Sequence, residues 1–550
     1  MMSSALWTLR TPCASSVLKL PSPPSTSYLC WLVGRLVDQY RTRSLHSGPL
    51  VPSSGSNGGR MIHPNDSEVP PPIDAPALIA GEWREKGDWF ERTGPYVRWT
   101  VSRARSTTLE EVDEALEYAR AARVRIASLA PATRAAVLER AAALALERRP
   151  ELARLLALEL GKPVKDGSGE ILRVADTFSV CAAEARRLSG EVLPVAGWER
   201  GIGNTSLTYR APVGVVLAIT PFNAPANLLA HKLGAAFAAG NTTVVKPPPQ
   251  APAASAAVVR LLLDAGMPLE AVQLLHGGAD IGAALASDPR IDAISFTGSS
   301  AAGAAVARAA GPRRTVLELG GNAATIVCDD ADIPSAAAVC ARTGYSNSGQ
   351  SCISVQRVYV HSSRYDEFLD AFTAQVSALK VGDPLDETTD VGAMVADAAA
   401  ERVVTWAEEA RAAGARILLG GTRDGATAAP TIVAAPPADA RVITEEVFGA
   451  LVAVTSYEDF SDVLAQCNTS RFGLQAGLFT HDLTKVFTAW RELEVGGLIV
   501  NGSSNFRLDH IPFGGVKDSG IGRESPRWML DDFTVTKTLT LRQLSIWGED

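Results

Sequence analysis

The sequence predicts an α/β fold in which mainly parallel sheets carry helices on both faces. Between residues 213 and 310, short runs rich in β-branched residues alternate with helical stretches, and this alternation is typical of parallel βαβ units. A second alternation of the same kind begins after Glu318. Polar residues directly follow three strands of the first set, at the position where parallel sheets bind ligands.

Length and composition narrow the class of protein. A chain of 550 residues is expected to form two or three domains, and 46% apolar with 20% charged residues is ordinary for a soluble globular enzyme. A net charge of −8 argues against nucleic acid as a partner, and there is no apolar run of about 18–20 residues to span a membrane. Seven cysteines without CxxC or metal-ligand spacing indicate reduced thiols and no metal site.

Residues 1–60 differ from the rest of the chain. They hold six basic residues against one acid, whereas the remaining residues hold 46 basic and 59 acidic side chains, a net charge of −13. Such an Arg- and Ser-rich start is expected of a transit peptide, and the alternative is an over-extended start with translation beginning at Met61. We expect residues 1–70 to be disordered. The protein is then expected in the cytoplasm, or in mitochondria if residues 1–60 are a transit peptide.

The first globular stretch is helical. Residues 77–83 predict a strand with a turn, and a helix at 109–128 follows an N-cap threonine with acids in its first turn. Long Ala/Leu/Arg/Glu stretches at 131–160 and 167–189 keep helical spacing, broken at Gly161-Lys162-Pro163.

The two α/β alternations follow. The first predicts strands at 213–219, 242–245, 272–275 and 291–296, and helices at 227–239, 253–264, 281–286 and 301–310. The second predicts strands at 325–327, 355–360, 416–419, 431–433, 450–457, 477–480 and 498–501, helices at 333–343 and 364–378, and an exposed final strand at 533–542. Because Asn223, Lys246 and Ser299 follow three strands of the first set, we expect them to line one ligand site.

Two short motifs carry residues suited to chemistry on a carbonyl group. Glu318 lies in the apolar, glycine-flanked stretch 317–322, and Cys352 follows Gly349-Gln350-Ser351, 34 residues later. A cysteine thiolate can attack a carbonyl carbon, and a buried carboxylate can activate the water that breaks the thioester. Glu318 could instead be a helix-start acid or an ion-pair partner. The spacing alone does not show that the two residues meet.

Other candidate residues have simpler interpretations. Cys328, Cys340 and Cys467 lie in apolar segments and are expected to be core thiols. His231 follows an apolar helical run and is expected to be structural, and Gly277-Gly278 is a weak cofactor signal.

Several motifs together resemble the aldehyde dehydrogenase superfamily, from about residue 75 to the end. They are residues 317–321, 349–352, 220–223, 296–299, 445–449 and 512–517. The stretches 227–232, 352–357 and 516–520 resemble the subgroup of lactaldehyde, phosphonoacetaldehyde, sulfolactaldehyde and non-phosphorylating glyceraldehyde-3-phosphate dehydrogenases. There are two departures: residues 92–106 lack the usual Asn-Pro…Gly turn, and Pro249 replaces a glutamate that many NAD-preferring relatives carry.

The resemblance implies a three-part chain. A Rossmann-like NAD(P)-binding domain would comprise residues 75–189 and 210–318, the catalytic domain residues 319–520, and the oligomerisation strands residues 190–209 and 533–545. It also implies a homodimer or homotetramer that acts on a small-molecule aldehyde with NAD or NADP as cofactor.

The resemblance also implies roles for single residues. Cys352 would be the nucleophile, Glu318 the base for hydrolysis, and Asn223 with the Cys352 N–H the donors to the developing alkoxide. Cofactor contacts would come from Thr220, Pro221, Phe222, Lys246, Gly298, Ser299, Glu446 and Phe448. Within this set, Lys246 would bond the ribose nearer the adenine, Ser299 the pyrophosphate and Glu446 the nicotinamide ribose.

Arg507 is a candidate for reading an anionic group on the aldehyde, because a guanidinium binds carboxylate, phosphonate or sulfonate in two parallel bonds. An ion pair with Asp509 is the alternative. Two rival functions are a CoA-acylating dehydrogenase and a catalytically inactive scaffold. Glu318 argues against the first because such enzymes tend to lack this base, and the intact set Cys352, Glu318, Asn223 and Lys246 argues against the second.

Overall fold

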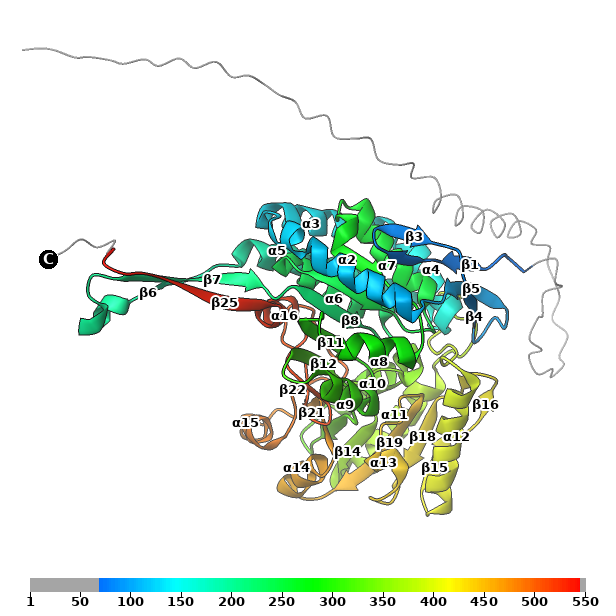
Figure 1. Ribbon diagram of the computed structural model, residues 1–550. Helices are drawn as coiled ribbons and strands as arrows, with labels where there is room; N and C mark the ends of the chain where they lie inside the picture. Colours follow the sequence, from blue (N-terminus) through cyan, green and yellow to red (C-terminus); the bar gives the residue numbers. More distant parts are fainter. Residues whose placement is uncertain (1–68, 545–550) are drawn as a thin grey trace, which may run out of the picture. The chain divides into compact units, whose positions relative to one another are not determined.

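The computed structural model describes residues 69–544, and the compact unit of the chain begins at Pro71 (Figure 1). The predicted extension at residues 1–70 lies outside the described residues except for its last two, and so does residue 545 of the second predicted oligomerisation strand. None of the described helices is long and apolar enough to span a membrane.

The first sheet has eight strands, in the order β24-β12-β11-β8-β9-β10-β2-β3. The five from β12 to β10 are parallel, whereas β24, β2 and β3 pair antiparallel at the two ends. Their bounds are β24 (Gly520–Ile521), β12 (Arg314–Glu318), β11 (Ala293–Thr297), β8 (Val215–Ile219), β9 (Thr242–Lys246), β10 (Val272–Leu274), β2 (Ala77–Ile79) and β3 (Glu82–Arg84).

Helices cover both faces of this sheet because successive strand side chains point to opposite sides. In β8, Val216 and Ala218 join one buried cluster, whereas Val215, Leu217 and Ile219 join another. The first cluster takes in α3 (Pro131–Glu147), α4 (Arg149–Leu160), α5 (Val164–Arg187), α6 (Pro225–Ala239) and α7 (Pro252–Asp264). The second lies under α2 (Leu109–Ala127), α8 (Ala279–Ser287) and the end of α9 (Ser300–Ala310).

The second sheet has seven strands, in the order β15-β18-β19-β14-β13-β21-β22, and all but β15 are parallel. Its strands are β15 (Arg416–Leu419), β18 (Thr431–Ala434), β19 (Leu451–Tyr457), β14 (Arg357–His361), β13 (Ala324–Val327), β21 (Gln475–Phe479) and β22 (Gly497–Val500). Its helices are α10 (Ile333–Tyr345), α11 (Tyr365–Ser377), α12 (Asp397–Ala412), α14 (Phe460–Asn468) and α15 (Leu483–Glu492). The predicted fold class, parallel sheets with helices on both faces, is confirmed.

A separate three-stranded sheet forms an arm of β6 (Val192–Leu193), β7 (Thr205–Pro212) and β25 (Thr534–Leu541). β25 pairs with β7 along eight residues, and Figure 1 shows the two strands as a long ribbon that follows α16 (Pro526–Asp532). The predicted exposed final strand is therefore confirmed. A further small sheet joins β1 (Ile73–Ala75), β5 (Thr100–Arg105) and β4 (Trp89–Thr93).

Several elements differ from the sequence prediction. β12 was not predicted because it begins with two polar residues, Arg314 and Thr315, and only its last three residues are buried. The stretch 131–160 forms two helices rather than one, since α4 starts afresh with Pro150 in its first turn. Helices α12, α14, α15 and α16 were also missed, whereas the predicted break at residues 161–163 is present.

Candidate active site

Two neighbouring strands of the first sheet end at predicted site residues. Glu318 is the last residue of β12 and pairs in register with Thr297 of β11, which Gly298 and Ser299 follow. The Gly298 N–H donates to the Glu318 carbonyl at 3.0 Å. This bond joins the turn after β11 to the end of β12.

The next two strands end beside them. Ile219, the last residue of β8, pairs with Lys246, the last residue of β9. The Thr220 N–H donates to the Lys246 carbonyl at 3.3 Å. Asn223 lies in the loop that follows β8, so the predicted polar residues do gather at the carboxyl ends of adjacent parallel strands.

The loop that carries Cys352 connects α10 to β14, a strand of the second sheet, and reaches the strand ends of the first sheet from there. Residues 347–349 all adopt left-handed backbone conformations, with φ of 49°, 56° and 71°, which turns the chain sharply before Cys352. The buried Gln350 side chain holds the turn, because it donates to the Asn347 carbonyl at 3.2 Å and accepts from the Val395 N–H at 2.9 Å. Cys352 itself is half-buried.

The cysteine loop and the glutamate motif lie in direct contact. A Cβ added at Gly321 would lie 2.0 Å from the Cys352 carbonyl oxygen, a distance that no side chain tolerates. Only glycine therefore lets residues 318–321 pack against the backbone of Cys352. The structure thus brings together the two motifs whose meeting the spacing left open.

Asn223 reaches the same loop. Its Nδ2 donates to the Gln350 carbonyl at 3.0 Å. A primary amide has two N–H bonds, so one is used on the loop and the second is left for another acceptor. Within residues 69–544 the backbone N–H of Cys352 likewise donates to no acceptor.

Burial raises the pKa of the Cys352 thiol to about 12, and the negative charges of Glu446 and Glu318 add to this effect. The Arg507 guanidinium acts in the opposite direction. The thiol therefore holds its proton at neutral pH in this state of the site, and forming the thiolate requires a change in the burial of the sulfur or in the charges around it.

Glu318 is 2% exposed, and neither of its carboxyl oxygens has a hydrogen-bond partner among the described residues. Burial, followed by the charge of Glu524, raises its pKa well above the usual range. A Cβ added at Gly514 would lie 2.8 Å from Glu318 Oε1, so the glycine of residues 512–517 leaves room for the carboxyl group. Glu318 is thus neither a helix-start acid nor an ion-pair partner within this part of the chain.

On the β9 side of the strand ends, the side chains suit a dinucleotide. Burial lowers the pKa of Lys246 to about 8 against the opposite effect of the Asp280 charge, and the ammonium group forms no ion pair within the described residues. The buried Thr220 hydroxyl also lacks a partner there. Ser299 caps α9 by accepting from the Ala302 N–H, and the start of a helix favours a phosphate group. An unpaired cation, an unsatisfied hydroxyl and a helix start together fit a dinucleotide cofactor.

Glu446 and Phe448 approach from the loop before β19. Glu446 Oε1 accepts from the Gly321 N–H at 2.9 Å, and burial raises its pKa to about 7. Phe448, with a φ of 47°, meets Phe222 edge to face with ring centroids 5.8 Å apart. These two rings lie between the Asn223 loop and the Glu446 loop.

The Aldehyde dehydrogenase family matches residues 83–539 of the chain. This chain belongs to that family. It is 42% identical to the 3-sulfolactaldehyde dehydrogenase of Priestia aryabhattai over 464 residues, which cover 84% of this chain and 97% of that protein. As an aldehyde dehydrogenase, it oxidises aldehydes to acids with NAD or NADP.

Solved structures agree with this assignment. Aldehyde dehydrogenase 21 from Physcomitrella patens, in complex with the reaction product succinate, is 36% identical with a TM-score of 0.84, covering 86% of this chain and 100% of that one. The NADP-dependent glyceraldehyde-3-phosphate dehydrogenase of Bacillus halodurans, complexed with NADP, is 33% identical with a TM-score of 0.83 and the same coverage. The subgroup that the sequence suggested, which includes sulfolactaldehyde dehydrogenases, is therefore confirmed.

Arg507 of this aldehyde dehydrogenase lies in a buried cluster of charges. Its Nη2 donates to Glu524 at 3.0 Å, and its guanidinium stacks 4.0 Å from the Phe513 ring. Asp509, the partner that the sequence suggested, is 4.0 Å away and binds Arg173 and His231 more closely, at 2.7 and 2.8 Å. The main partner of Arg507 is therefore Glu524. His231 is fully buried and bonded to Asp509, as expected of a structural histidine.

Sequence reasoning missed two acids of this site region. Glu524 is fully buried and pairs with Lys232 at 2.7 Å as well as with Arg507. Glu170 pairs with Lys162 beneath the Asn223 loop. A signal was available for Glu524. This acid lies between Arg523 and Ser525, shortly after the recognised motif at residues 512–517, and that position could have marked it as a site residue. Nothing in the helical stretch around Glu170 set it apart from the solvated acids nearby.

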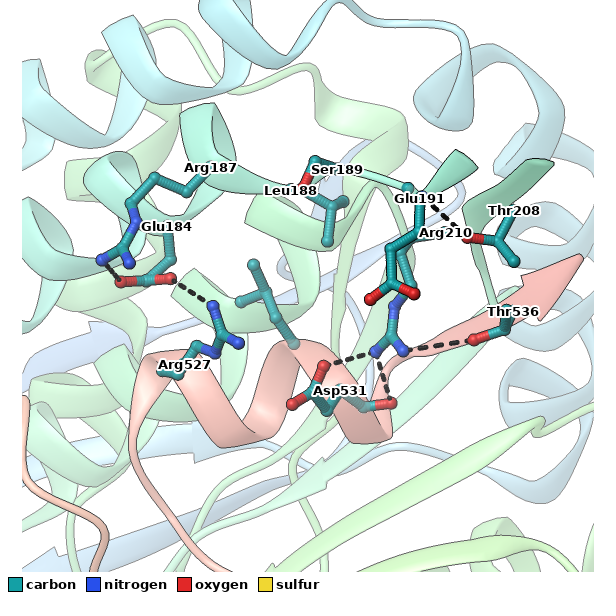
Figure 2. Close-up of a pocket in the computed structure, with 12 residues that line it drawn as sticks. Glu184, Arg187, Leu188, Ser189, Glu191, Thr208, Arg210, Arg527, Asp531 and Thr536 are labelled. Carbon is teal, nitrogen blue, oxygen red and sulfur yellow. Dashed lines mark hydrogen bonds and ion pairs between the residues drawn. The ribbon is translucent and has the colours of Figure 1, made fainter. Parts of the chain in front are cut away.

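A cavity of about 360 Å³ lies elsewhere, at the root of the arm between α5, β7, α16 and β25 (Figure 2). Its charged groups pair with one another except for Glu191, whose carboxylate forms no ion pair among the described residues. Arg187 binds Glu184, Arg527 lies near the same acid, and Arg210 binds Asp531. None of the predicted site residues lines this cavity, so it is separate from the candidate active site.

Proposed function

We propose that Cys352 attacks the aldehyde carbon as a thiolate, that Asn223 and the Cys352 N–H bind the developing alkoxide, and that Glu318 activates the hydrolytic water. The carbon–sulfur bond forms as the carbonyl opens to an alkoxide. When the carbonyl re-forms, the aldehyde hydrogen leaves with its electron pair, and a thioester remains on Cys352. The nicotinamide cofactor supplies the hydride acceptor for this step.

The second half of the reaction uses Glu318. Water bonds to the acyl carbon while its proton passes to Glu318, and the carbon–sulfur bond then breaks to release the acid and the thiolate. Two observations carry this proposal: Gly321 packs on the Cys352 carbonyl, and the Glu318 carboxyl group, buried and without a hydrogen-bond partner among the described residues, is near enough for its charge to raise the pKa of the Cys352 thiol. A buried acid without a partner is costly in a fold and is expected where it has a catalytic role.

We assign the cofactor contacts to the residues at the strand ends. Lys246 would bond the ribose nearer the adenine, and Ser299 with Gly298 would hold the pyrophosphate at the start of α9. Glu446 would bond the nicotinamide ribose, and Phe448 with residues 220–222 would border the ring. In this division, residues 75–189 and 210–318 bind the cofactor, residues 319–520 carry the chemistry, and residues 190–209 with 533–545 are the oligomerisation strands.

The proposed substrate is a short aldehyde with an anionic group. Two observations support it: the buried Arg507 guanidinium is close enough to influence Cys352 and Glu318, and its Nε lacks a hydrogen-bond partner among the described residues. Sulfolactaldehyde and succinate, which the relatives' names mention, each carry an anionic group besides the reacting carbon.

We further propose that a second copy of this chain binds the arm. β25 is an edge strand of eight residues, and an unpaired edge invites a strand from another chain. Large apolar side chains stand exposed on the same arm: Val192, Trp198, Ile202, Tyr209 and Leu539. We place the enzyme in the cytoplasm, or in mitochondria if residues 1–60 act as a transit peptide, because free cysteines suit a reducing compartment.

Reduced-cofactor absorbance with a panel of short aldehydes, measured with and without CoA, tests the proposal. Water as acyl acceptor predicts steady turnover without CoA and the free acid as product. Dependence on CoA, with an acyl-CoA product, would replace hydrolysis by acyl transfer. Absence of turnover with every aldehyde and both cofactors would contradict the mechanism.

A further inference from the structure

A buried ammonium group lies directly beneath the Asn223 loop. Lys162, in the break between α4 and α5, pairs with Glu170, and the side chains of both are 4% exposed. Its Nζ also donates to the backbone carbonyl of Asn223 at 2.6 Å. A buried charge is costly unless it is paired and hydrogen-bonded, and here one of the three donors is committed to the residue that carries the amide.

The Asn223 carbonyl has a second donor. Asn347 Nδ2 lies 3.1 Å from the same oxygen and 3.2 Å from the Gln350 carbonyl. Asn347 is itself held on α5, because its N–H donates to Asp166 at 2.7 Å. Two donors on one carbonyl leave the peptide group little freedom to rotate.

Glu170 holds the other side of the loop. Its Oε1 accepts from the N–H groups of Ala226 and Asn227 at 2.9 and 3.2 Å, in the first turn of α6. Ala224, the N-cap residue of α6, has no side-chain acceptor of its own, so an acid from another helix performs this role. Capping of α6 requires only the Glu170 carboxylate. It does not explain why Lys162 also donates to the Asn223 carbonyl.

We propose that Lys162 and Asn347 are positioning residues that fix the peptide group of Asn223, so that its free amide N–H points to the alkoxide formed on Cys352. This inference rests on the proposed role of Asn223. With the carbonyl fixed by two donors and Nδ2 anchored on Gln350, the direction of the second N–H is set before substrate binds. Donors that stabilise a developing charge act best when held in place in this way.

The expected size of the effect follows from known cases. Removing one alkoxide donor costs about 10²–10³ in kcat, and a misplacement of about 1 Å can cost about 10²-fold. Lys162→Met keeps the apolar stem but removes the donor. We expect it to lower kcat about 10- to 100-fold, with KM for the aldehyde and for the cofactor within about twofold of wild type.

A double-mutant cycle separates positioning from general structural support. If Lys162 acts through the Asn223 amide, then Lys162→Met has an effect within about twofold once Asn223→Ala is present. The full loss in both backgrounds would make Lys162 merely structural and overturn the inference. Normal kcat for Asn223→Ala alone would instead reject the proposed role of Asn223.

The controls use neighbouring groups. Lys165→Met removes a lysine of the first turn of α5 that pairs with Asp390 at the surface, and it should leave kcat unchanged. Alkylation of Cys352 by iodoacetamide needs no alkoxide donor and should keep its rate in Lys162→Met.

If Lys162→Met does not fold, Asn347→Gly removes the second donor at a left-handed position that glycine tolerates. A normal kcat for Asn347→Gly would then contradict the proposal.

Discussion

Burial is the largest influence on the pKa values of Cys352 and Glu318, the two proposed reacting groups. It raises the pKa of the thiol to about 12 and that of the carboxyl group well above its usual range. The charges of Glu446 and Glu318 also raise the pKa of the thiol, and the charge of Glu524 raises the pKa of Glu318, since negative charges nearby disfavour further ionisation. At neutral pH the thiol therefore holds its proton, and the ionisation of Glu318 is shifted to higher pH.

The rate of thioester hydrolysis is expected to rise with pH. A general base must be ionised, and the raised pKa of Glu318 moves its ionisation above the ordinary glutamate value of about 4.3. Single-turnover hydrolysis of the acyl-enzyme across pH gives the profile directly. The same rising limb in Glu318→Gln would mean that another group or free hydroxide acts as the base.

Arg507 is expected to set the charge preference of the substrate site. Arg507→Leu should raise KM for an anionic aldehyde about tenfold or more, a loss of about 1.4 kcal/mol, and leave a neutral aldehyde of similar length nearly unchanged. Arg507→Lys is the matched variant, because it keeps a cation for the buried Glu524 but loses the planar fork. Equal losses on both aldehydes would make Arg507 structural.

Sequence alone could nominate Cys352 and Glu318 from the composition of their motifs, and Asn223 because it follows a predicted strand and lies in a motif that resembles the family. It could not show that Gly321 packs on the Cys352 carbonyl, since that contact joins the end of β12 to a loop 31 residues later. The partner of Arg507 was also out of reach. The nearer Asp509 is drawn to Arg173 and His231, and only the fold brings Glu524 to the guanidinium.

Among the secondary-structure elements, buried strands of the first sheet were predictable where β-branched residues run together, as in β8 and β9. β12 was not, because its side chains are polar for the first two positions and buried only at the last three. Helices such as α14 and α15 were missed because they are short. Their amphipathic patterns lie between clearer strand patterns, and only the strands were predicted there.

The turn after β9 is expected to weaken discrimination between NAD and NADP. A glutamate there would repel the 2′-phosphate and bond the 2′-hydroxyl, whereas Pro249 can do neither and Lys246 offers a cation that forms no ion pair in residues 69–544. The ratio of kcat/KM for the two cofactors measures this. A preference for NAD above about a thousandfold, roughly 4 kcal/mol, would show that another residue excludes the phosphate. Pro249→Glu should shift the ratio towards NAD.

For the whole molecule, the arm is expected to determine the oligomeric state. Tyr209 and Leu539 are 60% and 52% exposed on the paired strands β7 and β25. Replacing both with Asp should reduce the mass measured by light scattering from that of a dimer or tetramer. Phe487→Asp on α15 removes a similarly exposed side chain away from the arm and should leave the mass unchanged. A monomeric wild-type protein would contradict the proposed role of the arm.

The central claim is that Cys352 and Glu318 act in sequence on one acyl group. Intact-protein mass spectrometry of Glu318→Gln, quenched after mixing with an aldehyde and cofactor, tests it most directly. The mechanism predicts about one reduced cofactor per active site and an acyl adduct that accumulates on the protein and is absent from Cys352→Ala. Normal steady turnover by either variant, or a burst without an adduct on Cys352, would contradict it.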